Sequence, residues 1–491
     1  MSRWMIAGLL LWWLTRLAAL EALPLHNDEG LHLTRAVEVW NGHPFWAISD
    51  GKIINHWVIA ALLPQAAPAF AGRLATLLVC AAGLAAGASL ARRWGGPPGW
   101  ALVCGLWIAA PYLFFYERLA FSDAQAGALV VVAVWAAARA ARRGRLDDAI
   151  LTGLALSLAI LFKFTAAPFA LTVTLLILAG RAPWRRRAAQ LALAAGVVAA
   201  GLSVPLAYLA LRGGEVFAVA LGWVGAGDRG ADFGANAAHL WAQLSGFGAF
   251  AWAALLVAGL ALLPRVTRLE GGLSRLSGAR ALLAWGLPVA LILLLGREVQ
   301  SRHFVVALPL ALTLAGVGLG RGIRRFRRAA VQRLTMTAGL GALLVGGLPF
   351  MLTAYADPAR LPLPDDVRYE HVTSHSAGYG LRAAVADLPA LTAARPAPIV
   401  GSMFPDSCRR ANFYAAAAAR LICADAPGLL AIEAALDEAG AVYVLSDSAP
   451  HIGVSGEALA TLGRTTRLAQ YMRPGETEAA ASVSLWLVEQ P

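Results

Sequence analysis

Long apolar runs recur along the first 355 residues, and they constrain the fold of this chain more than any other feature. A helix of about 20 apolar residues is long enough to cross a bilayer. Only 14% of the 491 residues are charged and 59% are hydrophobic, whereas soluble domains usually carry about a quarter charged residues. The composition therefore excludes a soluble globular protein and predicts a polytopic α-helical membrane protein of about eleven transmembrane helices. The expected spans lie near residues 4–22, 70–91, 98–116, 124–141, 147–162, 166–180, 188–211, 246–264, 281–296, 304–320 and 334–355.

Arginine clusters follow alternate spans and predict the orientation of the chain. Loops rich in Arg and Lys remain on the cytoplasmic side of a membrane. With eleven spans all five clusters fall on one side, so we expect a cytoplasmic amino terminus and an extracytoplasmic carboxy-terminal part. Because the basic residues cluster in these loops, we interpret the net charge of +12 as a signal of membrane topology and not of nucleic-acid binding. The clusters are Arg92–Arg93, Arg139–Arg145, Arg181–Arg187, Arg265–Arg280 and Arg321–Arg328.

Two domains are expected. Residues 1–356 would form the transmembrane domain, whose long first outer loop, residues 22–68, carries two apolar stripes at helical spacing. Such stripes suit short amphipathic helices at the membrane surface. Residues 357–491 alternate β-type runs with helical ones, which predicts a small extracytoplasmic α/β domain. The expected strands are 398–403, 441–446 and 482–488, and the expected helices are 380–391 and 429–439.

The four cysteines show neither metal-ligand spacing nor a CxxC motif. Cys80 and Cys104 lie in apolar runs, and we interpret them as packing residues. Cys408 and Cys423 lie in the expected outer domain, where an oxidising compartment permits a disulfide. The sequence leaves open whether that bond forms.

The run from Gly316 to Gly320 has three glycines at alternate positions and resembles a nucleotide-binding loop. It lies within an expected span, however, and lacks the strand–turn–helix context of such a loop. Close packing of helices through small residues is the favoured interpretation.

Most of the unusual polar residues follow spans that end on the expected outer face. Charged groups at membrane depth are costly, so a set that converges on one face indicates a functional site. The set comprises Asp28, Glu29, Glu117, Arg118, Asp123, Lys163, Arg297, Glu298, Arg302 and His303.

The acidic pair in the first outer loop also has a structural interpretation. Asp28 could cap a helix that begins at Glu29, because Asp is favoured at the N-cap. The pair could also bind a divalent cation, which is the one cofactor that we consider. His26, His32 and His56 lie in the same loop, and a metal site among them is an open alternative. Their spacing is not diagnostic of one, so no residue is assigned as a metal ligand.

The remaining charged residues have structural interpretations too. Arg118 and Asp123 could form an ion pair at the membrane surface. Lys163 could extend from the end of a span to the interface. Arg302 and His303 could be interfacial anchors.

Sugar transfer from a lipid phosphate requires the residue types found in this set. A carboxylate can take the proton from an acceptor hydroxyl. The leaving lipid phosphate gains negative charge as its bond to the sugar breaks, and fixed cations stabilise that change. An acidic pair with Lys and Arg at the lipid–water boundary supplies both functions.

Five motifs occur in a fixed order along the chain. They are Asp28-Glu29, Arg118-Leu119-Ala120 with Asp123, Phe162-Lys163-Phe164, Arg302-His303 before Leu308-Pro309, and Ala377-Gly378-Tyr379-Gly380-Leu381. This ordered set resembles the GT-C glycosyltransferases, specifically the bacterial branch related to protein O-mannosyltransferases and to the aminoarabinose transferase of lipid A. The resemblance covers essentially the whole chain and implies a GT-C fold and a sugar donor carried on a polyprenyl phosphate.

The resemblance also implies roles for the matching residues. Asp28 would be the catalytic base, and Glu29 would assist it. The residues expected to contact the donor phosphate are Lys163, Arg302, Arg297 and Lys52. The residues expected to support them are Arg118, Asp123, His303 and Tyr379, with Asp123 ordering the outer loops.

The chain departs from the family pattern at two places. Lys52-Ile53-Ile54 stands where related enzymes often have Lys-Pro-Pro-Leu, and His303 replaces a frequent tyrosine. The first departure bears on whether Lys52 contacts the donor phosphate as the corresponding lysine of related enzymes would. Both departures bear on which lipid-linked sugar the protein would prefer as its donor.

The main hypothesis is an inverting glycosyltransferase in the bacterial inner membrane. Its partners would be membrane lipids, a polyprenyl-phosphate-linked sugar and an acceptor, which is a protein, a lipid or a cell-wall glycan. A transporter or lipid flippase is the first alternative, but it would need polar residues through the bilayer centre. A non-catalytic envelope protein with the same fold is the second, and the retained Asp28-Glu29 pair disfavours it.

The orientation can be tested by cysteine accessibility labelling in intact cells. A single cysteine placed in the Arg321–Arg328 loop should resist a membrane-impermeant reagent, because the positive-inside rule places that loop in the cytoplasm. A cysteine placed in the first outer loop is the control and should be labelled. Labelling of the Arg321–Arg328 loop from outside would contradict the model.

Overall fold

The computed structural model divides into two compact units. The helical unit comprises Met1–Leu20, Glu38–Leu62 and Ala71–Ala356, and the carboxy-terminal unit comprises Glu21–Val37, Leu63–Phe70 and Asp357–Pro491. Part of the first loop therefore belongs to the carboxy-terminal unit. The structure describes residues 3–45, 52–62, 67–212, 232–247, 250–266, 269, 277–296, 299–393, 395–415, 419–424, 428–448, 452–475 and 482–490.

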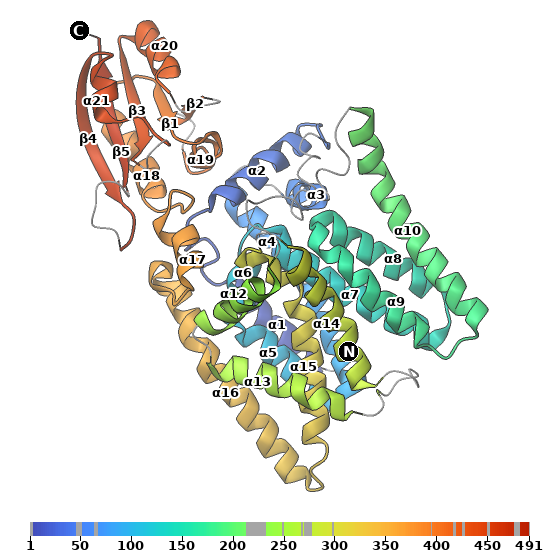
Figure 1. Ribbon diagram of the computed structural model, residues 1–491. Helices are drawn as coiled ribbons and strands as arrows, with labels where there is room; N and C mark the ends of the chain where they lie inside the picture. Colours follow the sequence, from blue (N-terminus) through green and yellow to red (C-terminus); the bar gives the residue numbers. More distant parts are fainter. Residues whose placement is uncertain are drawn as a thin grey trace. The chain divides into compact units, whose positions relative to one another are not determined.

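Helices coincide with every predicted span (Figure 1). Two short helices occupy the first loop, as predicted: α2 (Asn27–Trp40) and α3 (Ile53–Leu62). The helix α12 (Phe233–Gly246) was not predicted. The others are α1 (Arg3–Leu17), α4 (Pro68–Gly95), α5 (Pro97–Ala109), α6 (Pro111–Glu117), α7 (Ser122–Arg143), α8 (Leu146–Phe162), η2 (Phe164–Phe169), α9 (Ala170–Leu178), α10 (Trp184–Leu211), α13 (Phe250–Leu262), η3 (Leu263–Arg265), α14 (Gly278–Leu295), η4 (Ser301–Val306), α15 (Leu308–Ile323) and α16 (Ala329–Ala356).

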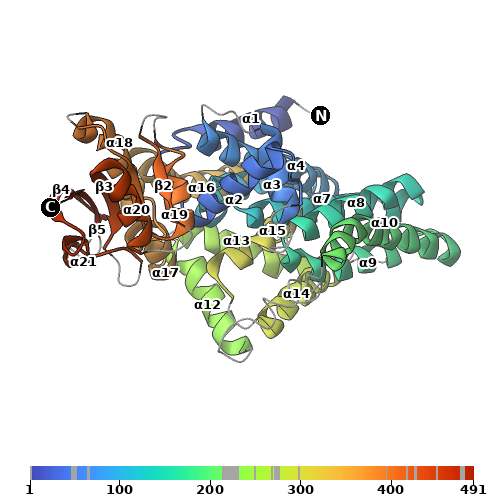
Figure 2. The same cartoon turned by 90° about the horizontal axis from the view of Figure 1, so that it is seen from above.

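The helices differ in whether they can cross a membrane alone. Among the described residues, α4, α7, α10, α14 and α16 are long and apolar enough, and α5 with α6 would make a sixth as one bent span. The other predicted spans fall on helices of fewer than 18 residues or on the broken pair of η2 and α9. The protein is thus a multi-pass membrane protein, and the count of eleven crossings stays a prediction. The helix α10 packs along α8 and α9 (Figure 1 and Figure 2), and only 6% of its apolar window is buried.

The span made by α5 and α6 bends by 66° at its break. Pro111 has no backbone N–H, so the carbonyl of Trp107, four residues earlier, has no helical donor. Arg16 of α1 donates from Nη2 to Trp107 O at 2.9 Å and from Nη1 to Ile108 O at 3.0 Å. An arginine from another helix therefore replaces the hydrogen bonds lost at the bend.

The charge of Arg16 is balanced at the same place. Its Nε donates to Glu117 Oε2 at 2.8 Å, and both side chains are fully buried. Glu117 also accepts hydrogen bonds from the indole N–H groups of Trp12 at 3.2 Å and Trp107 at 2.6 Å. Glu117, predicted as a candidate functional residue, thus lies in a buried network that joins α1 to both halves of the bent span.

The helix α15 packs between α5 and α13 through its glycines. A Cβ added to Gly318 would come within 2.0 Å of Gly259 O in α13, and one added to Gly320 within 2.6 Å of Gly99 Cα in α5. The close approach of three backbones explains the run from Gly316 to Gly320, as the sequence predicted.

The carboxy-terminal unit contains a five-stranded sheet in the order β2-β1-β3-β5-β4 (Figure 1). The strand β1 is parallel to β2 and β3, whereas β5 is antiparallel to β3 and β4. Helices α18 and α19 pack on one face, and α20 and α21 on the other. The elements are η5 (Pro358–Arg360), α17 (Asp365–Arg368), η6 (Tyr369–Thr373), α18 (Leu381–Thr392), β1 (Ile399–Ser402), α19 (Pro405–Ala411), β2 (Leu421–Cys423), α20 (Leu430–Ala439), β3 (Ala441–Asp447), α21 (Gly456–Ala460), β4 (Arg464–Met472) and β5 (Ser482–Glu489).

The predicted α/β character of this unit is confirmed. The three expected strands are β1, β3 and β5, and the two expected helices are α18 and α20. The sequence analysis missed the two edge strands, because β2 has only three residues and β4 alternates charged and polar residues with few apolar ones.

The buried Arg16–Glu117 pair can be tested by substituting one partner. Arg16→Met should lower the stability of the protein by about 3–5 kcal/mol, because it leaves Glu117 as an uncompensated buried charge. The midpoint of thermal unfolding in detergent measures the change. The exposed Arg327→Ala variant is a matched control that removes one arginine and should unfold as the wild type does. An unchanged midpoint in Arg16→Met would contradict the structural role of the pair.

Candidate functional site

Lys163 lies in the turn between α8 and η2, and its side chain is 12% exposed. Its Nζ forms an ion pair at 3.1 Å with Oδ1 of Asp123, the second residue of α7. Asp123 is therefore the partner of Lys163, and the ion pair between Arg118 and Asp123 considered from sequence is not the one that forms.

Arg302 and His303 lie in the 3-10 helix η4. Arg302 donates from Nε to Gln300 Oε1 at 2.8 Å, and its guanidinium lies 5.5 Å from the ring centroid of Phe121. His303 accepts the backbone N–H of Gln300 at Nδ1, at 3.1 Å. These contacts hold both side chains of the predicted Arg302-His303 motif.

A cluster of positive charge surrounds Lys163 in the helical unit. Lys52 and Arg302 lie close enough for their charges to act on the Lys163 ammonium group, and all three act on His303. Three of the four predicted phosphate-binding residues are therefore neighbours. The fourth, Arg297, lies outside the described residues, as does Glu298.

Arg118, predicted as a supporting residue, contacts the end of α1. It donates from Nη2 to the carbonyls of Ala18 at 2.8 Å and Ala19 at 2.5 Å. The last carbonyls of a helix have no partner within the helix, so a basic side chain there acts as a C-terminal cap. This contact assigns Arg118 a structural role in the helical unit.

Asp28 and Glu29 belong to the first turn of α2, in the carboxy-terminal unit. His26 caps this helix: its Nδ1 accepts the backbone N–H of Asp28 at 3.1 Å, and Glu29 Oε2 accepts the backbone N–H of His26 at 3.0 Å. This reciprocal arrangement is a capping box with histidine in place of Ser or Thr. The capping role considered for Asp28 is therefore wrong, because His26 is the N-cap and Asp28 is the second helical residue.

The position of α2 within its unit depends on Arg410 of α19. Arg410 donates from Nη1 to the carbonyls of Leu25 at 3.0 Å and Ser376 at 2.6 Å. A Cβ added to Gly30 would come within 2.5 Å of Arg410 Cβ, so glycine is needed where the two helices meet. Burial lowers the pKa of Arg410 to about 10, which leaves it charged at neutral pH. Sequence analysis missed Arg410, because a residue so far from Asp28 in the sequence carries no local signal of the contact.

His26, Glu370 and His371 offer ligand atoms within 4.8 Å of one another, which is close enough for a metal ion. The capping bond argues against that use. Because Nδ1 of His26 accepts a backbone N–H, a neutral ring carries its proton on Nε2, and Nε2 faces Glu370 Oε1 at 3.7 Å. A metal ion needs the lone pair that this proton occupies. The capping bond therefore makes the neutral His26 ring a poor metal ligand.

The predicted site residues are divided between the two units. Lys52, Asp123, Lys163, Arg302 and His303 belong to the helical unit. Asp28, Glu29 and Tyr379 belong to the carboxy-terminal unit. The divalent cation considered for Asp28 and Glu29 stays a prediction.

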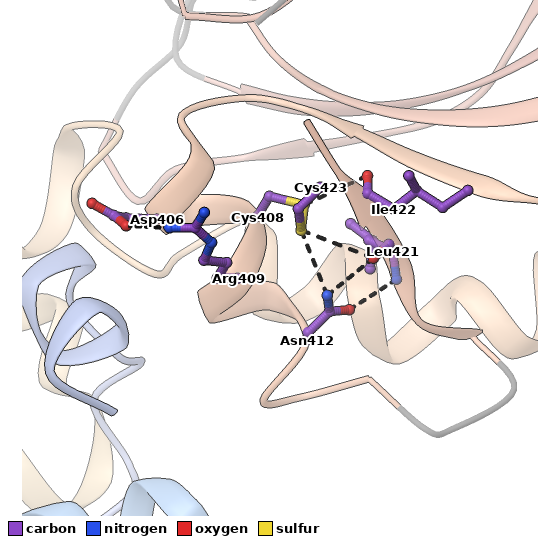
Figure 3. The surroundings of a disulfide bond; sticks show 7 residues. All are labelled: Asp406, Cys408, Arg409, Asn412, Leu421, Ile422 and Cys423. Carbon is purple, nitrogen blue, oxygen red and sulfur yellow. Dashed lines mark hydrogen bonds and ion pairs between the residues drawn. A yellow bond between two sulfur atoms is a disulfide. The ribbon is translucent and has the colours of Figure 1, made fainter. Parts of the chain in front are cut away.

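A disulfide joins Cys408 of α19 to Cys423 at the end of β2 (Figure 3). Asn412 adds to this link, because its side chain donates to Leu421 O at 3.0 Å and accepts from Leu421 N at 2.8 Å. The bond that the sequence left open therefore forms, and it fixes the edge strand β2 to the helix that carries Arg410.

Comparison with solved structures gives matches over nearly the whole chain. The crystal structure of ArnT from Cupriavidus metallidurans in the apo state matches with a TM-score of 0.62 and 16% sequence identity, covering 98% of this chain and 97% of that one. ArnT from the same organism bound to undecaprenyl phosphate matches with a TM-score of 0.66 and 17% identity, covering 98% of both chains. At this identity the likeness concerns the fold, and the predicted GT-C fold is confirmed. No family model and no curated protein sequence matches the chain.

Proposed function

We propose that this protein is a membrane glycosyltransferase that moves a sugar from a polyprenyl-phosphate carrier to an acceptor hydroxyl or amine. The observation that carries the proposal is the cluster of Lys52, Lys163 and Arg302 in the helical unit. The fold supports it, because a protein of the same fold was crystallised with undecaprenyl phosphate.

The charge of the cluster suits the donor throughout the reaction. A sugar joined to a polyprenyl phosphate is a phosphodiester with one negative charge. When the bond between the anomeric carbon and the phosphate oxygen breaks, the released polyprenyl phosphate carries close to two negative charges at neutral pH. Fixed cations therefore bind the leaving group more strongly than the donor, which lowers the barrier.

The ion pair with Asp123 prepares Lys163 for this role. A lysine side chain has many rotamers, and ordering it costs free energy. Asp123 holds Nζ in one place before the donor binds. Lys52 and Arg302 add two further cationic side chains to the cluster.

Asp28 is the proposed base. Its carboxylate would accept the proton of the acceptor while the acceptor oxygen or nitrogen bonds to the anomeric carbon and the phosphate leaves, with inversion at that carbon. Glu29 is less suited to this role, because it is fully buried and one of its oxygens accepts the N–H of His26. The supporting function first expected for Glu29 would then be to hold the helix turn that carries Asp28.

The proposed location is the outer face of the bacterial inner membrane, with a cytoplasmic amino terminus. The Cys408–Cys423 disulfide supports this orientation for the carboxy-terminal unit. Such bonds persist in oxidising compartments and are rare in the cytosol.

Loss of a cation should weaken phosphate binding. Arg302→Ala and Lys163→Ala should each bind undecaprenyl phosphate about tenfold to a hundredfold more weakly, because a hydrogen bond to a charged group contributes about 1.5–3 kcal/mol. Isothermal titration of the purified protein in detergent measures the affinity.

Two variants control for indirect effects on binding. Lys163→Arg retains the charge and should recover part of the lost affinity. Arg327→Ala removes one exposed arginine from the loop after α15 and should leave the affinity unchanged. Wild-type affinity in both alanine variants would reject the assignment of the cluster to the donor phosphate.

Substitution of Asp28 separates catalysis from structure. Asp28→Asn should leave undecaprenyl phosphate binding unchanged, because the cluster is untouched. It should lower thermal stability only slightly, because His26 still caps the helix and the change removes one charge that acts on Arg35. The rate of transfer should fall roughly a hundredfold or more, because an amide cannot act as the base. Single-turnover assays with a radiolabelled donor, found by screening polyprenyl-phosphate sugars, measure that step.

Glu29→Gln is the matched variant for this experiment. Its amide oxygen can still accept the His26 N–H, so the capping box survives. We expect a far smaller loss of rate than in Asp28→Asn. Full transfer activity in purified Asp28→Asn would end the assignment of Asp28 as the base.

A further inference from the structure

A cleft of about 630 Å³ lies within the carboxy-terminal unit, beside the end of β3. It is on the sheet face that packs against α20 and α21. Its volume is in the range of small-molecule binding sites. None of the residues predicted to act in sugar transfer lines it.

The strand register explains how one apolar ring and several polar groups share the floor of the cleft. Directly paired residues of neighbouring strands point to the same face of a sheet. Ser484 of β5 is paired with Ser446 of β3 and with Gln470 of β4, which gives a polar row across three strands. Two residues along β5, Trp486 is paired with Arg467 on the same face.

The wall above Trp486 is built by the segment that leads into α21. Ser446 Oγ donates to Val454 O at 2.7 Å, and Ser402 Oγ accepts the backbone N–H of Val454 at 3.0 Å. A Cβ added to Gly456 would come within 2.5 Å of the Trp486 ring, so the backbone lies against the indole edge. These contacts fix the wall to the ends of β1 and β3 and give the cleft its shape in advance of any ligand.

The floor has hydrogen-bonding capacity that the fold does not use. Ser484 is only 6% exposed, and among the described residues no hydrogen bond involves its hydroxyl. Gln470 donates from Nε2 to Ser482 Oγ at 2.9 Å, and its amide oxygen remains as an acceptor. The Ser484 hydroxyl lines the cleft, so a ligand can bond to it in place of water.

The position of Arg467 adds a charged edge to the cleft. Its side chain is exposed, and its guanidinium lies 5.7 Å from the centroid of the Trp486 ring. The guanidinium lies over the indole and carries planar donors for hydroxyl or carboxylate oxygens.

A ligand for this cleft needs an apolar face and a polar edge on one rigid body. A pyranose ring has both, because its axial C–H bonds form an apolar face while its hydroxyl groups lie around the rim. The C–H face suits the Trp486 ring, and the hydroxyls suit Ser484, Gln470 and Arg467. We propose that this cleft is a saccharide-binding site, separate from the residues assigned to the donor phosphate. The proposal does not rest on the transfer reaction, because binding requires no donor and no chemistry.

The test is binding of the full-length protein in detergent to an array of immobilised neutral and uronic-acid-containing oligosaccharides, with no lipid donor present. The wild type should be retained on at least one saccharide. Trp486→Leu removes the flat ring but keeps an apolar side chain, and Ser484→Leu projects bulk from the floor into the cleft. Each should weaken that binding at least tenfold.

Arg464→Ala is the matched control, because Arg464 is exposed on the same strand as Arg467 but does not line the cleft. It should bind as the wild type does. Gln470→Ala, at a half-buried position, should also weaken binding, and it serves if either leucine variant unfolds at a lower temperature. The proposal is overturned if the wild type binds no saccharide, or if folded cleft variants bind with wild-type affinity.

Discussion

A membrane interior offers no water to hydrogen-bond a backbone carbonyl, and this constraint explains the buried polar network of the helical unit. The bend at Pro111 exposes carbonyls that only another side chain can satisfy. Arg16 supplies the donors, and Glu117 supplies the opposite charge. Arg118, the next residue, then caps the helix that carries Arg16. Glu117 and Arg118 are adjacent charged residues of the kind found in active sites, but both join α1 to the bent span. The proposed chemistry therefore uses other residues.

The proposed base is supported by a different kind of contact. Around Asp28 one supporting group is local, since His26 caps the turn, and one comes from a distant part of the chain, since Arg410 bonds to the backbone beside it. The cation cluster is held instead by Asp123 and Gln300 within the helical unit. Within each unit, the proposed catalytic and phosphate-binding residues are therefore held by hydrogen bonds or ion pairs of that same unit.

The sequence predicted those elements whose formation depends on residues close together in the chain. Apolar length located the helices, and alternation located three strands and two helices of the carboxy-terminal unit. Charge at the ends of spans identified Lys163 and Arg302 as candidates. It could not distinguish them from Arg118, because the distinction depends on which carbonyl or carboxylate lies opposite. His26 as a cap could not be predicted, since histidine is not a favoured N-cap type.

The glycine contacts of α15 have a consequence for the motions open to the protein. Packed helices can slide past one another by small shear displacements, which the interdigitated side chains between them take up. Between α15 and its neighbours α5 and α13 there is almost no side-chain layer to rearrange, because backbone meets backbone at Gly318 and Gly320. These three helices therefore move together as a block. Any relative displacement of helices must then occur between other pairs. The pair of α8 and α10 is a poor candidate too, because a Cβ added to Gly153 of α8 would come within 2.5 Å of Ala194 O in α10.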